Sequence, residues 1–179
     1  MSKKVTSTQA QHSGRVSKPA VLKLGHDLTR FDCGKDQITG WLQKRARQAA
    51  DNDTAQTFVI CRGSKRVIGY HSLAAGAAAH ASVSSAIRQN TPDPIPVIVL
   101  ARLGVHQGEQ GNGLGQDLLT DALKRAVKAA RIVGARGLLI HALDAEAAKF
   151  YEDRGFKRLK ANEDITYFMS MKTIRENLT

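Results

Sequence analysis

Hydrophobic and polar positions follow two different periods in the second half of the chain. Residues 97–105 form an almost continuous apolar run, which is typical of a central strand buried on both faces. After a glycine-rich stretch, apolar residues recur every three or four positions over 114–131, which predicts an amphipathic helix. Beyond it we expect a buried strand at 137–143, a short helix at 144–154 and closing strands at 156–159 and 165–171.

The first half of the chain carries weaker patterns. Residues 57–62 and 66–73 are rich in β-formers on either side of a Gly-Ser-Lys turn, which predicts a hairpin that ends in the small residues of 74–81. The other expected elements are a strand at 20–24, a helix over 38–49 and a loop over the proline-rich 86–96. This order of elements indicates one mixed α/β (α+β) domain built on a single sheet.

Composition narrows the class of protein. The 179 residues suffice for one domain, and 42% hydrophobic residues supply its core. Residues 1–18 are polar and aperiodic, so we expect a disordered basic arm before a domain that spans 19–179. The chain has neither an apolar run of about 18 residues nor an apolar leader, and its only cysteines are Cys33 and Cys61. We therefore expect a cytoplasmic protein without a membrane span, a disulfide framework or a metal site.

Charge is distributed unevenly along the chain. The net charge is +11, and the first 50 residues hold ten Lys or Arg against three Asp. This bias favours attraction to a polyanion such as nucleic acid. A solvated surface with a flexible basic tail would give the same composition, so composition alone does not separate the two interpretations.

The glycine-rich stretch carries the most specific chemistry. The segment Gln110-Gly111-Asn112-Gly113-Leu114-Gly115 lies between a predicted strand and a predicted helix. Glycines there let the backbone approach a ligand, and the helix N-terminus attracts phosphate. The segment is not a P-loop, and Gln116 stands where a dinucleotide fingerprint requires glycine. A glycine cluster by itself is equally compatible with a simple strand-to-helix turn.

The spacing Gln110-x-x-Gly113-x-Gly115 resembles the acyl-coenzyme A pyrophosphate loop of the GNAT superfamily of N-acetyltransferases. A second segment, from Asp144 through Phe150-Tyr151 to Gly155-Phe156, is similar to the family's Asn-x-x-Ala-x-x-Phe-Tyr and Gly-Phe segment, with Asp144 in place of Asn. The resemblance implies a GNAT fold, with a mixed, mostly antiparallel sheet, a splayed central strand and flanking helices. It also implies binding of acetyl-CoA by Leu103, Val105, Gln110, Gly111, Gly113, Leu114, Gly115 and Asp144.

A narrower resemblance rests on four further segments. These are Phe31-Asp32-Cys33-Gly34, Thr57-Phe58-Val59, Pro92-Asp93-Pro94-Ile95-Pro96 and His141-Ala142-Leu143. Together they are similar to the acetyltransferase toxins of type II toxin–antitoxin modules. That resemblance implies acetylation of the α-amine of aminoacyl-tRNA, which blocks translation. It further implies a ribbon-helix-helix antitoxin, operator DNA bound only through the antitoxin complex, and a homodimer. The alternative is an N-acetyltransferase for a small amine or a protein N-terminus.

Acetyl transfer needs a neutral amine, a polarised thioester and a proton for the departing thiolate. Tyr151 is the candidate acid, although it could also serve only as packing over the cofactor. Residues 100–105 contain no Asp or Glu, so no base is evident there. An α-amine with a pKa of about 7.7–8.0 is neutral far more often at pH 7 than a lysine near 10.4, which favours an α-amine substrate. The candidate tRNA contacts are Lys44, Arg45, Arg47 and Arg88.

Overall fold

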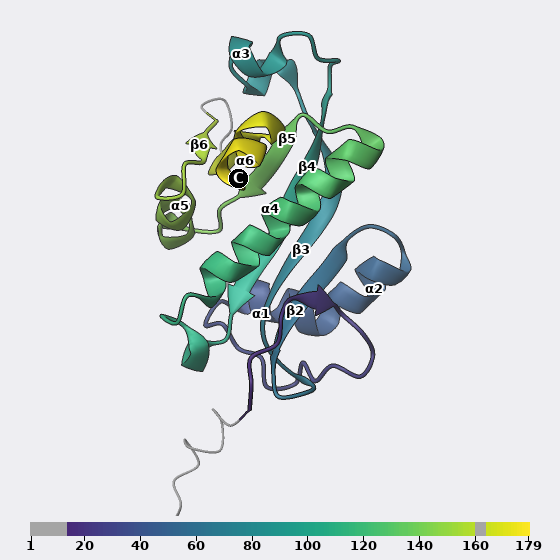
Figure 1. Ribbon diagram of the computed structural model, residues 1–179, viewed down its shortest axis with the longest axis vertical. Coiled ribbons are helices and arrows are strands. Elements are labelled where there is room, and N and C mark those ends of the chain that lie inside the picture. The colour runs from purple at the N-terminus through teal and green to yellow at the C-terminus, as the bar shows by residue number, and fades with distance from the viewer. Residues whose placement is uncertain (1–13, 160–163) are drawn as a thin grey trace, which may run out of the picture.

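The computed structural model describes residues 14–159 and 164–179, which fold around one seven-stranded sheet (Figure 1). The strand order is β1-β2-β3-β4-β5-β7-β6, and only the β4–β5 pair is parallel among these strands. The strands are β1 (Ala20–Val21), β2 (Gln56–Arg62), β3 (Arg66–Ala78), β4 (Ile95–Val105), β5 (Gly137–His141), β6 (Lys157–Arg158) and β7 (Thr166–Ser170). The expected mixed, mostly antiparallel sheet is confirmed.

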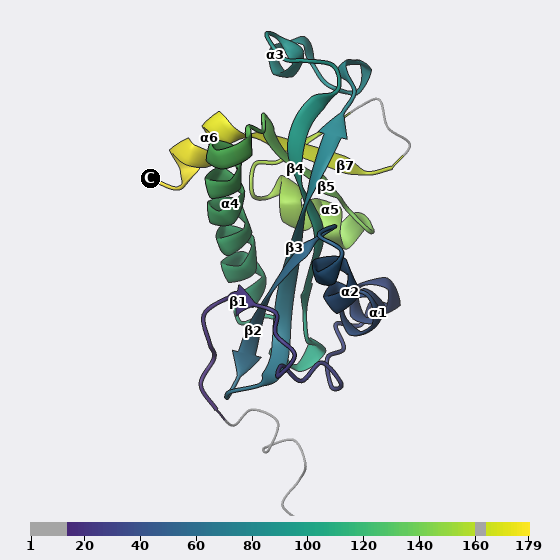
Figure 2. The same cartoon turned by 90° about the vertical axis from the view of Figure 1, so that its right-hand side faces the viewer.

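Helices cover both faces of the sheet, with α4 along one face and α1 and α2 on the other (Figure 2). Leu114 and Leu118 of α4 pack on the buried Ile60 and Ile68, while Leu42 and Ala46 pack on the opposite face. The helices are α1 (Asp36–Lys44), α2 (Ala46–Asp51), α3 (Ser85–Arg88), α4 (Leu114–Val133), α5 (Ala145–Glu152) and α6 (Met171–Asn177), with 3-10 turns η2 (His80–Ser82) and η3 (Gln107–Glu109). Across the described residues, no helix is long and apolar enough to cross a membrane.

Two expected elements of the first half of the chain have other bounds in the structure. The helix expected over 38–49 is interrupted at Arg45, whose φ of −124° separates α1 from α2. The second hairpin strand ends among the small residues of 74–81, as expected, but β3 continues past residue 73 to Ala78, paired with β4. The space beside Gly76 is filled by Val99, so a small residue is what this pairing requires.

The ends of the chain also differ from the expectation. Residues 1–13 of the expected arm lie outside the described residues. The described part of that arm is attached to the sheet, since Val16 pairs with Arg62 and the Ser17 N–H donates to the Cys61 carbonyl at 2.8 Å. At the other end, α6 was not expected. Ser170 caps it by accepting the Thr173 N–H at 3.1 Å, a local signal that the short apolar pattern did not reveal.

The two parallel central strands separate along their length. They pair only over Ile98–Leu100 and Leu138–Ile140, whereas β4 stays paired with β3 as far as Val105. The register of the β3–β4 pair shifts at Ala101, which has no partner between the pairs of Leu100 and Arg102. Such a bulge bends a strand and redirects it. The second half of β4 therefore diverges from β5, as expected of a splayed central strand.

Candidate active site

A cleft of about 350 Å³ opens where β4 leaves β5. Its walls are the second half of β4, the loop between β4 and α4, the residues before α1, and α5. Seven of the eight residues expected to bind the cofactor line it: Leu103, Val105, Gln110, Gly111, Gly113, Leu114 and Gly115. The structure thus brings together residues that the sequence assigned to one ligand, with Tyr151 beside them.

The glycine-rich loop has the geometry of an anion cradle. Gly111 and Gly113 have φ values of +83° and +82°, which side chains rarely tolerate, and nothing lies within 4 Å of where a Cβ would be. Gly113 directly precedes the first residue of α4, so the free backbone N–H groups and the positive end of the helix dipole face the cleft. This arrangement suits a phosphate or pyrophosphate group.

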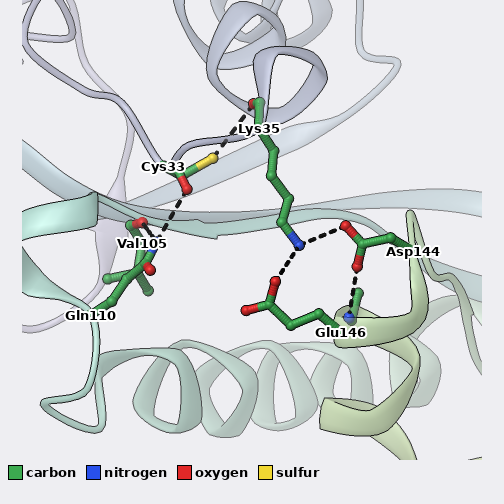
Figure 3. Close-up of polar contacts among 7 residues, drawn as sticks. Cys33, Lys35, Val105, Gln110, Asp144 and Glu146 are labelled. Atoms are coloured by element: carbon green, nitrogen blue, oxygen red, sulfur yellow. Dashed lines mark hydrogen bonds and ion pairs between the residues drawn. The ribbon is translucent and has the colours of Figure 1, made fainter.

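Gln110 holds this loop in place. Its side-chain Nε2 donates to the carbonyls of Val105, at 2.9 Å, and Cys33, at 3.1 Å (Figure 3). The amide therefore ties the loop to the end of β4 and to the turn before α1. The sequence placed Gln110 among the cofactor-binding residues, and in this structure both of its N–H groups are used for the loop itself.

A buried ion pair between Arg62 of β2 and Glu109 also holds the start of this loop. The Nε and Nη2 atoms of Arg62 each lie 2.7 Å from a carboxylate oxygen of Glu109, a paired geometry that suits guanidinium and carboxylate. Glu109 is only 1% exposed although it lies next to Gln110 in the chain. Sequence reasoning missed this pair, because 47 residues separate its two members.

Tyr151 lies on α5 and is 6% exposed, with its ring among apolar and aromatic side chains. It makes edge-to-face contacts with Phe150 and Phe156, at centroid distances of 5.2 and 5.7 Å. Burial raises the pKa of the Tyr151 hydroxyl far above its ordinary value, so the group keeps its proton. Within the described part of the chain nothing hydrogen bonds to that hydroxyl, which therefore remains available to a ligand in the cleft.

Asp144 has a structural role at the start of α5. Its Oδ1 accepts the Ala147 N–H at 2.9 Å and so caps the helix, while its Oδ2 lies 2.7 Å from the Nζ of Lys35. The hydrogen bond from Lys35, followed by that from the Ala147 N–H, lowers the pKa of the Asp144 carboxyl. Asp144 does not itself line the cleft, but Lys35 does, and sequence reasoning did not find Lys35.

Arg154 is a second cleft residue that sequence reasoning missed. Its guanidinium lies 3.7 Å from the centroid of the Phe150 ring, and its Nη1 donates to the Phe150 carbonyl at 2.8 Å. It lines the cleft together with Gln116 of α4. The guanidinium of Arg154 therefore lies at the phosphate-binding end of the cleft. In the sequence, only the position of Arg154 directly before Gly155 could have indicated this role.

A second hollow, of about 360 Å³, lies where β4, β5 and the start of α1 meet. A narrow space of about 70 Å³ is lined by residues of both hollows, among them Tyr151, Arg102 and His141. His141 is exposed at the end of β5, and its Nδ1 lies 3.0 Å from the Thr166 hydroxyl oxygen. Where β4 and β5 separate, the cleft therefore lies on one side of the narrow junction and the second hollow on the other.

The four candidate tRNA contacts are not brought together. Lys44 and Arg45 are exposed at the end of α1, and Arg47 of α2 donates to the His26 carbonyl at 2.8 Å. Arg88 is exposed on α3, at the opposite end of the molecule from α1 and α2 (Figures 1 and 2). At most the first three share one surface.

A sheet that splays between two parallel strands, with a glycine-rich loop at the head of a helix and a buried tyrosine in the cleft, defines an acyl-transferring class of enzyme. The model of the acetyltransferase (GNAT) domain family matches residues 53–158. A tRNA-acetylating toxin of Mycobacterium tuberculosis (strain ATCC 25618 / H37Rv) is 40% identical over 159 residues, 89% of this chain and 95% of the relative. The chain therefore belongs to the GNAT acetyltransferase family.

Two solved structures are similar over almost the whole molecule. AtaT complexed with acetyl-methionyl-tRNAfMet has a TM-score of 0.84 and 27% identity, covering 92% of this chain and 100% of that one. A tyrosine-to-phenylalanine mutant of the AtaT toxin, bound to the C-terminus of the antitoxin AtaR and acetyl-CoA, has a TM-score of 0.78 and 26% identity, covering 92% and 98%. The fold of this chain is therefore that of a toxin acetyltransferase.

Proposed function

We propose that this protein is a toxin that transfers the acetyl group of acetyl-CoA to the α-amine of aminoacyl-tRNA and so blocks translation. The observation that carries the proposal is the pair of binding spaces that meet at Tyr151 between β4 and β5. One is a cleft with a phosphate cradle, and the other is open to a large acceptor. The relative that is 40% identical is named as a tRNA-acetylating toxin, which supports the same substrate.

In this proposal, acetyl-CoA places its pyrophosphate on the loop from Gln110 to Gly115 and its pantetheine arm along β4. Beyond Leu100 that strand does not pair with β5, so its backbone near Leu103 and Val105 can pair with the amides of the arm. The Tyr151 hydroxyl then donates a hydrogen bond to the sulfur as thiolate character develops. A donor with a raised pKa stabilises that charge while it keeps its own proton.

The acceptor side fits an amine that does not require a strong base. Among the described residues, no Asp or Glu lines the narrow junction itself, where the imidazole of His141 lies, and Asp164 lines the adjoining hollow. An α-amine is partly neutral at physiological pH, since its pKa is about 7.7–8.0, whereas a lysine side chain is almost entirely protonated. The junction therefore favours the α-amine of an aminoacyl ester over a protein lysine.

The decisive experiment supplies the purified protein with bulk charged tRNA and labelled acetyl-CoA. After hydrolysis of the ester bond, we expect label on the α-amine of one or a few amino acids. If no amino acid is labelled although the protein binds acetyl-CoA, aminoacyl-tRNA is not the substrate. It would favour a small amine or a protein N-terminus, to be assayed with the same donor.

The partners are part of the same proposal. A structural relative is bound to the C-terminus of an antitoxin, which supports an antitoxin as the partner of this chain. We further propose that this antitoxin is of the ribbon-helix-helix type, that operator DNA is bound through the complex of both proteins, and that the toxin is a homodimer. Light scattering of the purified protein measures the homodimer directly, and a monomer mass would contradict it.

A tRNA ligand makes the activity depend on salt through the exposed end of α1. The double variant Lys44→Gln/Arg45→Gln is expected to weaken binding of charged tRNA several-fold and to lower the slope of log K against log salt by about 1–2, because each phosphate contact contributes slightly less than one. Fluorescence anisotropy at several salt concentrations measures both. The matched control Lys172→Gln/Arg175→Gln removes two exposed charges of α6 and should leave the slope unchanged. An equal change in both variants would mean that α1 has no specific role.

A further inference from the structure

Lys35 crosses the cleft from one half of the molecule to the other. It directly precedes α1, and its side chain reaches the N-terminal end of α5 (Figure 3). Its Nζ lies 2.7 Å from Asp144 Oδ2 and 3.1 Å from Glu146 Oε2. The side chain also lines both the main cleft and the narrow junction next to Tyr151. Lys35 is therefore placed near the reacting end of the cleft.

The charge of Lys35 is fixed by its surroundings. Burial alone would lower the pKa of its amine, but hydrogen bonds and charges from Asp144 and Glu146 outweigh burial and raise that pKa. Lys35 is thus a permanent ammonium and not a competing acetyl acceptor. An ammonium has three N–H donors, of which the two carboxylates take two. The third remains for a group in the cleft.

The other side chains that line the cleft near Lys35 offer few hydrogen-bond donors. Leu103, Val105, Ile38 and Ala147 are apolar, and the Glu146 carboxylate can only accept hydrogen bonds. The other cation that lines the cleft in the described residues, Arg154, lies by Phe150 at the phosphate end. A neutral arm that carries amide carbonyls would therefore meet one charged donor here, the ammonium of Lys35.

We propose that Lys35 is a cofactor-binding residue, whose ammonium, held by Asp144 and Glu146, donates a hydrogen bond to a carbonyl oxygen of the pantetheine arm of acetyl-CoA. This inference rests on the proposed function, because it takes acetyl-CoA as the ligand of the cleft. It assigns to the two acids the role of orienting the donor. It also explains why a carboxylate at position 144 is compatible with cofactor binding.

The test compares two ligands by titration calorimetry: acetyl-CoA, and 3′-phosphoadenosine 5′-diphosphate, which keeps the pyrophosphate and lacks the pantetheine arm. Lys35→Met is expected to raise the Kd of acetyl-CoA about tenfold, as the loss of a hydrogen bond from a charged donor does, and to leave the Kd of the fragment unchanged. Lys35→Arg keeps a cationic donor and should stay within about threefold of the wild type. Lys149→Met removes an exposed lysine that pairs with Asp153 on the same helix, and should change neither Kd.

Each outcome decides the question. An unchanged Kd for acetyl-CoA in Lys35→Met would overturn the proposal, and so would an equal loss for both ligands, which would make Lys35 a structural tie between the two halves. If Lys35→Met does not fold, as judged by thermal unfolding, Lys35→Gln is measured in the same way. A wild-type protein that binds no acetyl-CoA at all would instead refute the proposed function, which keeps the two failures distinct.

Discussion

Replacement of Tyr151 by phenylalanine is expected to lower kcat for acetyl transfer by about 100-fold or more, while the Kd of acetyl-CoA changes less than about twofold. The substitution removes one hydroxyl and keeps the ring, so the contacts with Phe150 and Phe156 remain. The stability of the fold should change little. The loss therefore falls on the step in which the sulfur of coenzyme A becomes a thiolate and needs a proton or a hydrogen bond.

The raised pKa of Tyr151 gives this prediction a second consequence. Because burial keeps the hydroxyl protonated, its donor role should persist up to the most alkaline pH at which the protein is stable. Single-turnover rates with charged tRNA should therefore depend on alkaline pH in the same way in the wild type and in Tyr151→Phe. Tyr167→Phe, which removes a hydroxyl that donates to Glu152 and does not line the cleft, is the control and should keep the wild-type kcat. Full activity in Tyr151→Phe would end the assignment of Tyr151 as the acid.

Patterns that are local in the sequence predicted the central part of the fold. The apolar run of β4, the glycines of the loop and the period of α4 are each contained within about twenty residues, so strand, turn and helix follow from the order of residues alone. The same segment supplied the seven expected cofactor-binding residues that line the cleft. Asp144 shows the limit, because the sequence assigned it to the cofactor, whereas in the structure it caps α5 and pairs with Lys35, which is 109 residues away in the chain.

The pairs that complete the site could not be predicted because their members are far apart in the chain. Lys35 and Asp144 are separated by 109 residues and Arg62 and Glu109 by 47, and no periodicity connects such positions. The same reason explains the candidate tRNA residues. Arg47 looked like any other basic residue of its helix, but the fold directs its guanidinium to the carbonyl of His26. A count of charges therefore showed that the first part of the chain is basic, without indicating which charges are free to bind.

The buried ion pair between Arg62 and Glu109 lies where the glycine-rich loop begins, and its removal should be costly. Arg62→Met is expected to lower the free energy of unfolding by about 3 kcal/mol or more, because a carboxylate that is 1% exposed loses its bidentate counter-charge. Urea denaturation measures the change. Lys149→Met breaks an exposed pair on α5 and should cost less than about 1 kcal/mol, which separates the effect of burial from that of charge.

The same variant should also weaken the cofactor site, since Glu109 is joined directly to Gln110 and fixes where the glycine-rich loop begins. We expect the Kd of acetyl-CoA to rise together with the loss of stability in Arg62→Met. Arg62→Lys retains the charge without the two-pronged geometry and should be intermediate in both measurements. Wild-type stability together with an unchanged Kd of acetyl-CoA in Arg62→Met would show that this ion pair does not hold the loop.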